Sequence, residues 1–252
     1  MTKILAAIDN SSAARPVLAV AEAVAALLGA ELEAVHVQED AGATARAVTG
    51  AAGIALRVAT GSVIGGLVAA GEEEDVRVLV VGLRGTPAGP HPAGSVALAL
   101  IVALGKPVVV VPPQTRVPYT IERILVPLNG TAETAEALKD VIELVSEAPT
   151  TVVALHVLEH HALPFFNDQP QHEVDTWRRE FLIRHGEHFE RLQLEVRIGS
   201  PAEHLLPVAG ETEADLIALA WAQDLSAGRA AVVREALGRS DVPVLLVPVR
   251  SA

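Results

Sequence analysis

The chain of 252 residues contains no cysteine, which excludes disulfide scaffolds, Cys-ligated zinc or iron–sulfur sites and thiol catalysis. Aromatic residues make up only 3% although half of the residues are hydrophobic, so the core is expected to consist of Ala, Val, Leu and Ile. Positive charge is also scarce, because 19 Lys and Arg oppose 31 Asp and Glu for a net charge of −12. This balance argues against a nucleic-acid-binding surface. The composition is that of a globular protein.

Targeting and membrane signals are weak. The N-terminus lacks the charged and apolar regions of a signal peptide, so we expect a cytoplasmic protein. The apolar stretch 94–111 approaches the length of a membrane helix, about 18 residues or more. Gly105-Lys106-Pro107 divides it, however, into a helix-like half and a valine-rich half. We therefore expect a helix, a turn and a strand, and no membrane segment.

The chain repeats itself. The segment 3–11 (KILAAIDNS) matches 123–131 (RILVPLNGT), and LEAVHV at 32–37 matches VVALHV at 152–157, both at an offset of 120. Further on, 76–82 matches 215–220 at an offset of 138, and PVVVVP at 107–112 matches PVLLVP at 243–248 at an offset of 136. We therefore divide the chain into a first copy, residues 1–118, and a second copy, residues 119–252. The change in offset places an insertion at about 158–196.

Each copy reads as short apolar strands that alternate with helices. In the first copy we expect strands near 3–8, 31–37, 54–59, 76–82 and 107–111, with helices such as Ser12–Leu28 and Val63–Glu73 between them. In the second copy the strands are expected near 123–128, 150–157, 193–198, 215–220 and 243–247. The pattern predicts an α/β fold with two tandem open parallel five-stranded sheets flanked by helices.

Two segments of the first copy converge where ligands bind in such sheets, beyond the carboxyl ends of the strands. Asp9 follows the first strand, and the fourth strand ends in Gly82-Leu83-Arg84-Gly85, before a loop that leads to Gly94-Ser95 and a helix. Glycines permit close approach of the backbone, and the amides at a helix N-terminus suit phosphate. The same residues are also ordinary turn and N-cap residues, so taken alone the pattern leaves both interpretations open.

The twofold unit ILAAIDNS…LEAVHV…VLVVGLRG…GS…KPVVVVP resembles the universal stress protein family in its tandem form. The family's nucleotide-binding members carry G-x2-G-x9-G-[ST]; here eight residues separate Gly85 from Gly94, one fewer than in that pattern. The resemblance implies that ATP or AMP, with Mg²⁺ accompanying ATP, binds the first copy. It also implies antiparallel pairing of the two final strands about a pseudo-twofold axis. The residues that it places at the nucleotide are Ala7, Asp9, Val37, Val81, Gly82, Gly85, Gly94, Ser95 and Val96.

The second copy departs from the motif. Asn129 stands where Asp9 was, Ala220 replaces Gly82, Gln223 replaces Gly85, and Ala230-Ala231 replace Gly94-Ser95. These changes remove backbone clearance and a hydroxyl, and Trp221 is large enough to fill an adenine-sized hollow. Arg229 and Arg234 flank the helix start and could attract an anion, or simply form a solvated helix face. We expect a degenerate site here.

The insertion holds all four phenylalanines, five of the nine histidines and one of the two tryptophans. Val174, Trp177 and Phe181 would share one face of a helix, which favours packing onto the second copy; a partner-binding surface or a lid is the alternative. The histidines are His160, His161, His172, His185 and His188, and their spacing does not meet the needs of a zinc site.

No nucleophile elbow, P-loop or dinucleotide fingerprint is present, and no acid, base or metal pair can be named for catalysis. We therefore expect a non-enzymatic, regulatory adenine-nucleotide-binding module; weak ATPase activity is the enzymatic alternative. A different class is a nucleotide-free interaction protein that uses the insertion to bind a protein partner. Self-association of the chain is a separate possibility that the sequence leaves open.

Overall fold

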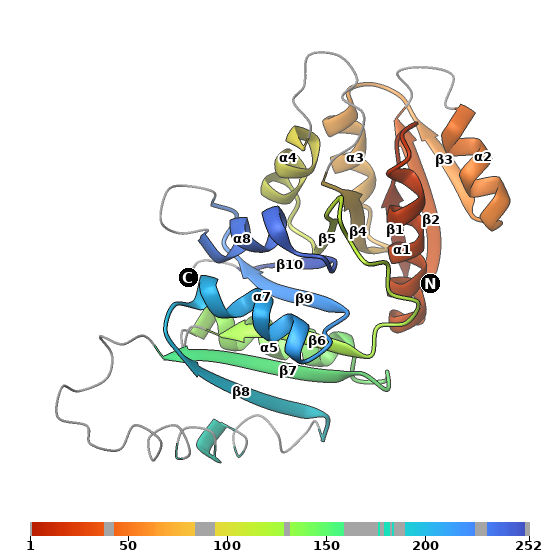
Figure 1. Ribbon diagram of the computed structural model, residues 1–252. Coiled ribbons are helices and arrows are strands. Elements are labelled where there is room, and N and C mark those ends of the chain that lie inside the picture. The colour runs from red at the N-terminus through yellow and green to blue at the C-terminus, as the bar shows by residue number, and fades with distance from the viewer. Residues whose placement is uncertain are drawn as a thin grey trace.

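A computed structural model describes residues 2–37, 43–83, 94–128, 132–158, 176, 179–181, 183, 190–224 and 231–249. In the first copy the strands alternate with helices as the sequence predicts (Figure 1). The elements, in chain order, are β1 (Lys3–Ala7), α1 (Ala14–Leu28), β2 (Glu31–Val37), α2 (Ala43–Ala52), β3 (Ala55–Ala59), α3 (Val63–Gly71), β4 (Val76–Gly82), α4 (Ser95–Ala103) and β5 (Val108–Val111). Helix α4 and strand β5 confirm that the apolar stretch 94–111 is a helix followed by a strand.

The second copy repeats this order. Its elements are β6 (Arg123–Leu128), α5 (Ala132–Leu144), β7 (Thr151–Leu158), β8 (Leu192–Ile198), α7 (Pro201–Glu211), β9 (Leu216–Trp221), α8 (Ala231–Arg239) and β10 (Val244–Pro248). Within the insertion, the described residues 176, 179–181 and 183 are helical. All described helices are too short or too polar to cross a membrane.

The ten strands form one sheet in the order β3-β2-β1-β4-β5-β10-β9-β6-β7-β8. Pairing is parallel within each half, and the two halves meet through β5 and β10, which run antiparallel with Val109 opposite Leu245. This confirms the antiparallel pairing of the final strands. Each of these valine- and leucine-rich strands is thereby covered at the edge that it would otherwise leave open.

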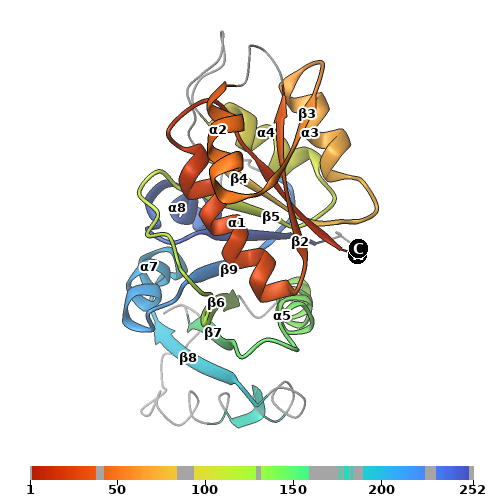
Figure 2. The same cartoon turned by 90° about the vertical axis from the view of Figure 1, so that its right-hand side faces the viewer.

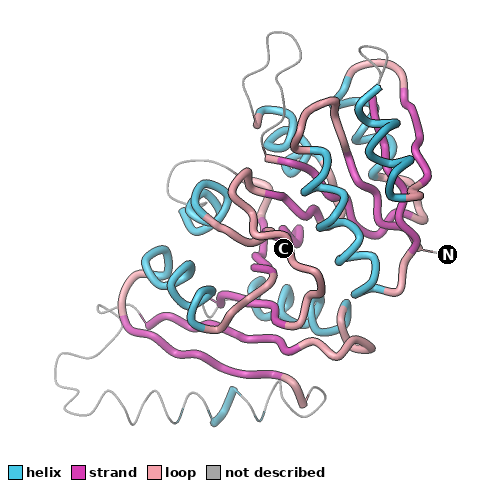
Figure 3. Tube along the Cα trace, turned by 45° about the vertical axis from the view of Figure 1, so that its right-hand side comes forward, coloured by secondary structure: helices cyan, strands magenta, loops and turns pink. Residues whose placement is uncertain are grey.

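Helices cover both faces of the sheet, as Figures 2 and 3 show. One face buries apolar residues of α1, α2 and α5, and the other buries residues of α3, α4, α7 and α8. Side chains alternate between the faces along each strand, so Ala6 and Ile8 join the first cluster while Leu5 and Ala7 join the second. Strands covered on both faces explain the nearly continuous apolar runs in the sequence.

Candidate functional site

Three of the predicted site residues lie at the carboxyl ends of adjacent strands. Ala7 of β1 is opposite Val81 of β4 on one side and Val35 of β2 on the other, and Val37 ends β2. Ala7, Val37 and Val81 are buried in the cluster that the α3 and α4 side chains complete. They therefore provide one apolar floor, on a single face of the sheet.

Asp9 lies just beyond this floor, where β1 leaves the sheet. Its Oδ1 accepts hydrogen bonds from the backbone N–H of Ser11 at 2.9 Å and from the Ser11 hydroxyl at 2.6 Å. The Ser11 hydroxyl oxygen in turn accepts a hydrogen bond from the Ala13 N–H at 3.1 Å, directly before α1. The carboxylate thus organises the turn into α1. The position of Asp9 after β1 agrees with the sequence pattern, whereas this structural role was not predicted.

The N-terminus of α4 forms the next part of the site. Gly94 has φ of +90°, and a Cβ placed on it would lie 2.9 Å from the carbonyl oxygen of Leu83. Leu83 directly follows Gly82, the last residue of β4, which pairs with Val111 of β5. A side chain at position 94 would therefore collide with the backbone at the end of β4, and glycine keeps the helix start pressed against the sheet edge.

Ser95 is the first residue of α4, and its hydroxyl oxygen is buried without a hydrogen-bond partner among the described residues. A buried hydroxyl without a partner costs free energy that a ligand acceptor or donor would recover. The N–H groups of the first turn of α4 also lack partners within the helix, and the helix dipole favours an anion there. Val96, next along the helix, packs against the core cluster of this face.

The predicted residue Gly85 lies outside the described residues, as does Arg84. The structure therefore brings together Ala7, Val37, Val81 and Gly82 at the strand ends and Gly94, Ser95 and Val96 at the helix start, with Asp9 at the end of β1.

A histidine at the same sheet edge had not been predicted. The Nδ1 atom of His36 lies 3.0 Å from the carbonyl oxygen of Ile8, the residue before Asp9. The Nε2 atom of His36 is buried and has no hydrogen-bond partner among the described residues. Because Nδ1 donates to a carbonyl, the neutral tautomer leaves Nε2 as an acceptor. His36 faces the α1 side of β2, opposite to the apolar floor.

The same contact recurs in the second copy. The Nδ1 atom of His156 lies 3.3 Å from the carbonyl oxygen of Leu128, at the offset of 120 residues that relates the copies. Burial lowers the pKa of His156, and the hydrogen bond to Leu128 offsets part of that effect. The signal for both residues was the histidine shared by LEAVHV and VVALHV. The histidine–carbonyl contact occurs also in the copy with the degenerate motif. We therefore assign it a structural role, which is to hold the carboxyl end of β1 in the first copy and of β6 in the second.

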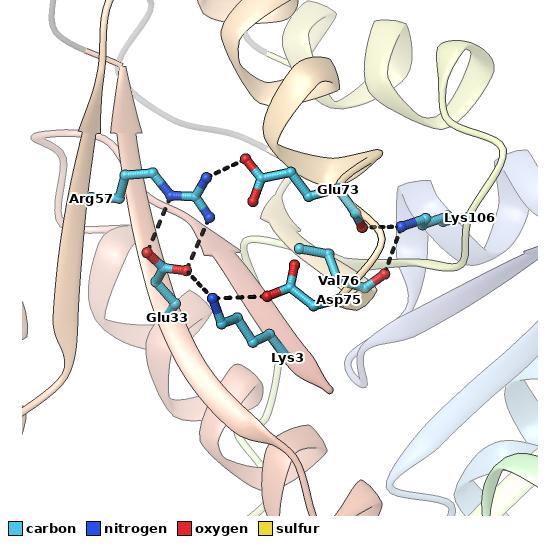
Figure 4. Close-up of polar contacts among 7 residues, drawn as sticks. All are labelled: Lys3, Glu33, Arg57, Glu73, Asp75, Val76 and Lys106. Carbon is cyan, nitrogen blue, oxygen red and sulfur yellow. Dashed lines mark hydrogen bonds and ion pairs between the residues drawn. The ribbon is translucent and has the colours of Figure 1, made fainter. Parts of the chain in front are cut away.

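Five charged side chains of the first copy form one network of ion pairs, drawn in Figure 4: Lys3, Glu33, Arg57, Glu73 and Asp75. Arg57 of β3 donates to both carboxylate oxygens of Glu33 in β2 and to Glu73, while Lys3 of β1 pairs with Glu33 and Asp75. The hydrogen bond between Lys3 and Asp75 raises the pKa of the lysine and lowers the pKa of the aspartate. Lys3 begins β1 and Asp75 directly precedes β4, so these ion pairs join β1, β2 and β3 to the turn before β4.

The second copy has a different arrangement at the equivalent edge. Ala220 stands near the end of β9, and Gln223, the counterpart of Gly85, keeps a positive φ of 57° without being glycine. The indole N–H of Trp221 donates to the carbonyl oxygen of Ile101, in α4 of the first copy, at 2.8 Å. Trp221 is thus directed at the first copy, a contact that the sequence did not predict. Asn129, Arg229 and Ala230 lie outside the described residues.

In the part of the chain that the structure describes, no group of three or more His, Asp or Glu side chains could hold a metal ion. The five histidines of the insertion lie outside the described residues, as do Val174 and Trp177. Phe181 is buried in the cluster that includes Leu192 and Leu194 of β8. For this residue the structure supports the packing interpretation of the aromatic stripe.

Comparison with known proteins adds family and fold. The model of the universal stress protein family matches residues 120–248, which correspond to the second copy. No curated protein matches the chain.

Three solved structures cover nearly the whole chain. A universal stress protein from Archaeoglobus fulgidus DSM 4304 is 18% identical with a TM-score of 0.69, and 98% of each chain is covered. A protein from Pseudomonas aeruginosa UCBPP-PA14, provisionally named a universal stress protein, is 14% identical with a TM-score of 0.67, over 99% of this chain and 94% of that one. A functionally unknown protein from Pseudomonas aeruginosa PAO1 is also 14% identical, with a TM-score of 0.63 and coverage of 99% and 93%.

At these identities the solved structures establish a shared fold over both copies. The family model matches just over half of the 252 residues by sequence. We conclude that the chain belongs to the universal stress protein family.

Proposed function

We propose that the protein is a regulatory module without catalytic activity that binds one adenine nucleotide, ATP or AMP, in its first copy. The observation that carries this proposal is the buried Ser95 hydroxyl, which has no hydrogen-bond partner among the described residues, beside a Gly94 that has no room for a side chain. Both stand at the N-terminus of α4, where backbone N–H groups and the helix dipole favour phosphate.

The remaining residues fit the other parts of a nucleotide. Ala7, Val37 and Val81 offer an apolar surface for the base at the carboxyl ends of three adjacent strands. Asp9, at the end of β1, offers a carboxylate to the ribose or the base, in line with the family resemblance. Gly82 lets the backbone of β4 approach the phosphates. Mg²⁺ would accompany ATP and reduce the charge of its phosphates.

The second copy supports a single site in the chain. Trp221, Gln223 and Ala231 stand where the first copy has Leu83, Gly85 and Ser95, so a hydroxyl and a glycine are lost together. Net charge follows the same division, because residues 1–118 carry 8 basic and 10 acidic residues while the rest of the chain carries 11 and 21. The second copy, at −10, repels a polyphosphate more strongly than the first, at −2.

Native mass spectrometry with ATP, AMP and cyclic AMP tests this proposal. We expect one nucleotide per chain, lost in Gly94→Trp because the indole would fill the space against Leu83. The matched control is Ala231→Trp, which adds the same bulk at an exposed helix start in the second copy and should retain binding. Absence of any bound nucleotide at millimolar concentration would overturn the proposal and favour the nucleotide-free interaction protein.

A further inference from the structure

The C-terminal end of α4 is bound by the second copy. The indole N–H of Trp221 donates to the Ile101 carbonyl oxygen at 2.8 Å, and the Gln223 side-chain amide donates to the Leu104 carbonyl oxygen at 2.6 Å. The last carbonyls of a helix have no partner within the helix. Trp221 and Gln223, which we call the brace, therefore supply donors that α4 cannot supply itself.

Sheet topology explains why these residues meet. Strand β10 runs antiparallel to β5 and parallel to β9, so the carboxyl end of β9 lies beside the amino end of β5. Helix α4 ends at Ala103, shortly before β5 begins at Val108. Figure 1 shows β5 and β10 side by side where the two halves join. The edge of the second copy that corresponds to the nucleotide site thus faces the end of α4.

Gln223 shows that this contact has a cost. Its φ of 57° lies in the left-handed region, which is unfavourable for a residue with a Cβ. The first copy has glycine at this position, Gly85, where the offset of 138 residues relates the copies. A glutamine kept in a glycine conformation is accounted for by what its side chain binds, since the short bond to Leu104 would be lost with glycine.

The first copy has no counterpart of the Trp221 donor. The residue at the equivalent position is Leu83, which has no side-chain donor and packs partly buried against the core. Trp221 is only 3% exposed, so its N–H would be unsatisfied without the Ile101 carbonyl. The second copy therefore binds the C-terminal end of α4 through the side chains of Trp221 and Gln223. Leu83 has no side-chain N–H with which to form the equivalent hydrogen bond to the second copy.

We propose that Trp221 and Gln223 are positioning residues that set the placement of α4, and through it the phosphate end of the nucleotide site. Helix α4 has nine residues and is therefore about 13 Å long. A helix this short moves as a unit, so its Gly94-Ser95 end follows its Ile101–Leu104 end. The effect of the brace on nucleotide binding rests on the proposed function. The two hydrogen bonds that hold α4 do not depend on it. In the second copy, residues at the positions of the nucleotide motif thus hold a helix of the first copy.

Two variants separate the brace from simple packing. Trp221→Phe removes the indole N–H and keeps an aromatic ring in the core. Gln223→Gly removes the side-chain donor and places glycine at a left-handed backbone position. If the Gln223 side chain did not hold α4, this substitution would not loosen the helix. Trp177→Phe, which changes the other tryptophan of the chain, is the matched control.

Hydrogen exchange measured by mass spectrometry on the full chain gives the first readout, and needs no ligand. We expect exchange in the α4 peptide, residues 95–104, to rise about fivefold or more in both variants, as loss of one hydrogen bond to a buried carbonyl predicts, with β1 and β4 peptides unchanged. Unchanged exchange in α4 in both variants would overturn the brace.

Calorimetric titration with ATP and AMP gives the second readout. We expect Trp221→Phe and Gln223→Gly to weaken nucleotide binding about threefold to tenfold while Trp177→Phe binds like the wild type. Faster exchange in α4 with unchanged affinity would overturn the coupling to the site. If the wild type binds no nucleotide, the proposed function and the coupling both fail, whereas the exchange data still decide the brace.

Discussion

The carbonyl oxygen of Leu83 lies 2.9 Å from the point where a Cβ on Gly94 would stand. This distance joins the end of β4 to the start of α4 and leaves space there only for glycine. Gly94 also has φ of +90°, so both space and backbone conformation select the same residue.

Gly94→Ala should therefore be costly. We expect a loss of about 1–2 kcal/mol in the free energy of unfolding from the backbone conformation, and nucleotide binding weakened about tenfold as the helix start shifts. Urea unfolding and calorimetry measure the two effects. Gly210→Ala is the control, because it lies in α7 with nothing within 4 Å of its Cβ position among the described residues. It should be neutral or stabilising by about 0.5–1 kcal/mol; equal losses in both variants would contradict the account.

Ser95→Ala should separate stability from binding. The Ser95 hydroxyl is buried and has no partner in the part of the chain that the structure describes, so its removal should leave the free energy of unfolding unchanged or raise it by about 1 kcal/mol. Nucleotide affinity should fall about fivefold. Ser240 is the matched control, because its buried hydroxyl donates to the Val242 carbonyl and accepts from the Val242 N–H. Ser240→Ala should lose about 1 kcal/mol and keep its affinity. A Ser95→Ala protein that is destabilised and binds normally would show that Ser95 has only a structural role.

Acid should destabilise the protein through His156. Burial lowers the pKa of this residue in the folded chain, so below about pH 6.5 the unfolded chain binds more protons than the folded one. The stability is thus complete above that pH and is lost as pH falls toward the folded pKa. His156→Asn keeps a donor for the Leu128 carbonyl and removes the titration. We expect its unfolding free energy, measured in urea, to fall less than that of the wild type between about pH 7.5 and pH 5; parallel curves would exclude His156 as the source.

Arg57→Met tests whether the ion pairs that Arg57 forms with Glu33 and Glu73 are independent of the site. Arg57 binds Glu33 through two nitrogens, at 3.1 and 2.9 Å, and also binds Glu73. Because this side chain is partly exposed, we expect a loss of only about 1 kcal/mol, and a smaller loss at high salt. Nucleotide affinity should stay within about twofold. Weaker binding in this variant would show that the two ends of the first copy are coupled.

Much of the fold follows from the sequence because it rests on local patterns and on repetition. The runs 107–112 and 243–248 are apolar and match each other, and a strand of that kind must be covered. Their antiparallel pairing came from the family resemblance and is found in the structure. Helix α2 is not among the helices predicted above, because its ten residues contain Thr, Gly and few large apolar side chains.

The site could be predicted only in part. Glycine and serine at a helix start, after a strand, carry a local signal that placed Gly82, Gly94 and Ser95 correctly at the sheet edge. The role of Asp9 in the turn with Ser11 competes with its expected role toward a ligand, and sequence cannot separate them. The hydrogen bond from Trp221 to Ile101 joins residues 120 positions apart and depends on the pairing of β5 with β10. A local sequence pattern therefore cannot predict it.

Calorimetric titration of the full chain with ATP and AMP, in the wild type and in Ser95→Ala, tests the central claim most directly. The account predicts saturable binding of one nucleotide per chain and about fivefold weaker binding in the variant, whose stability is not reduced. Absence of binding at millimolar nucleotide, two nucleotides per chain, or equal affinity in both proteins would contradict it.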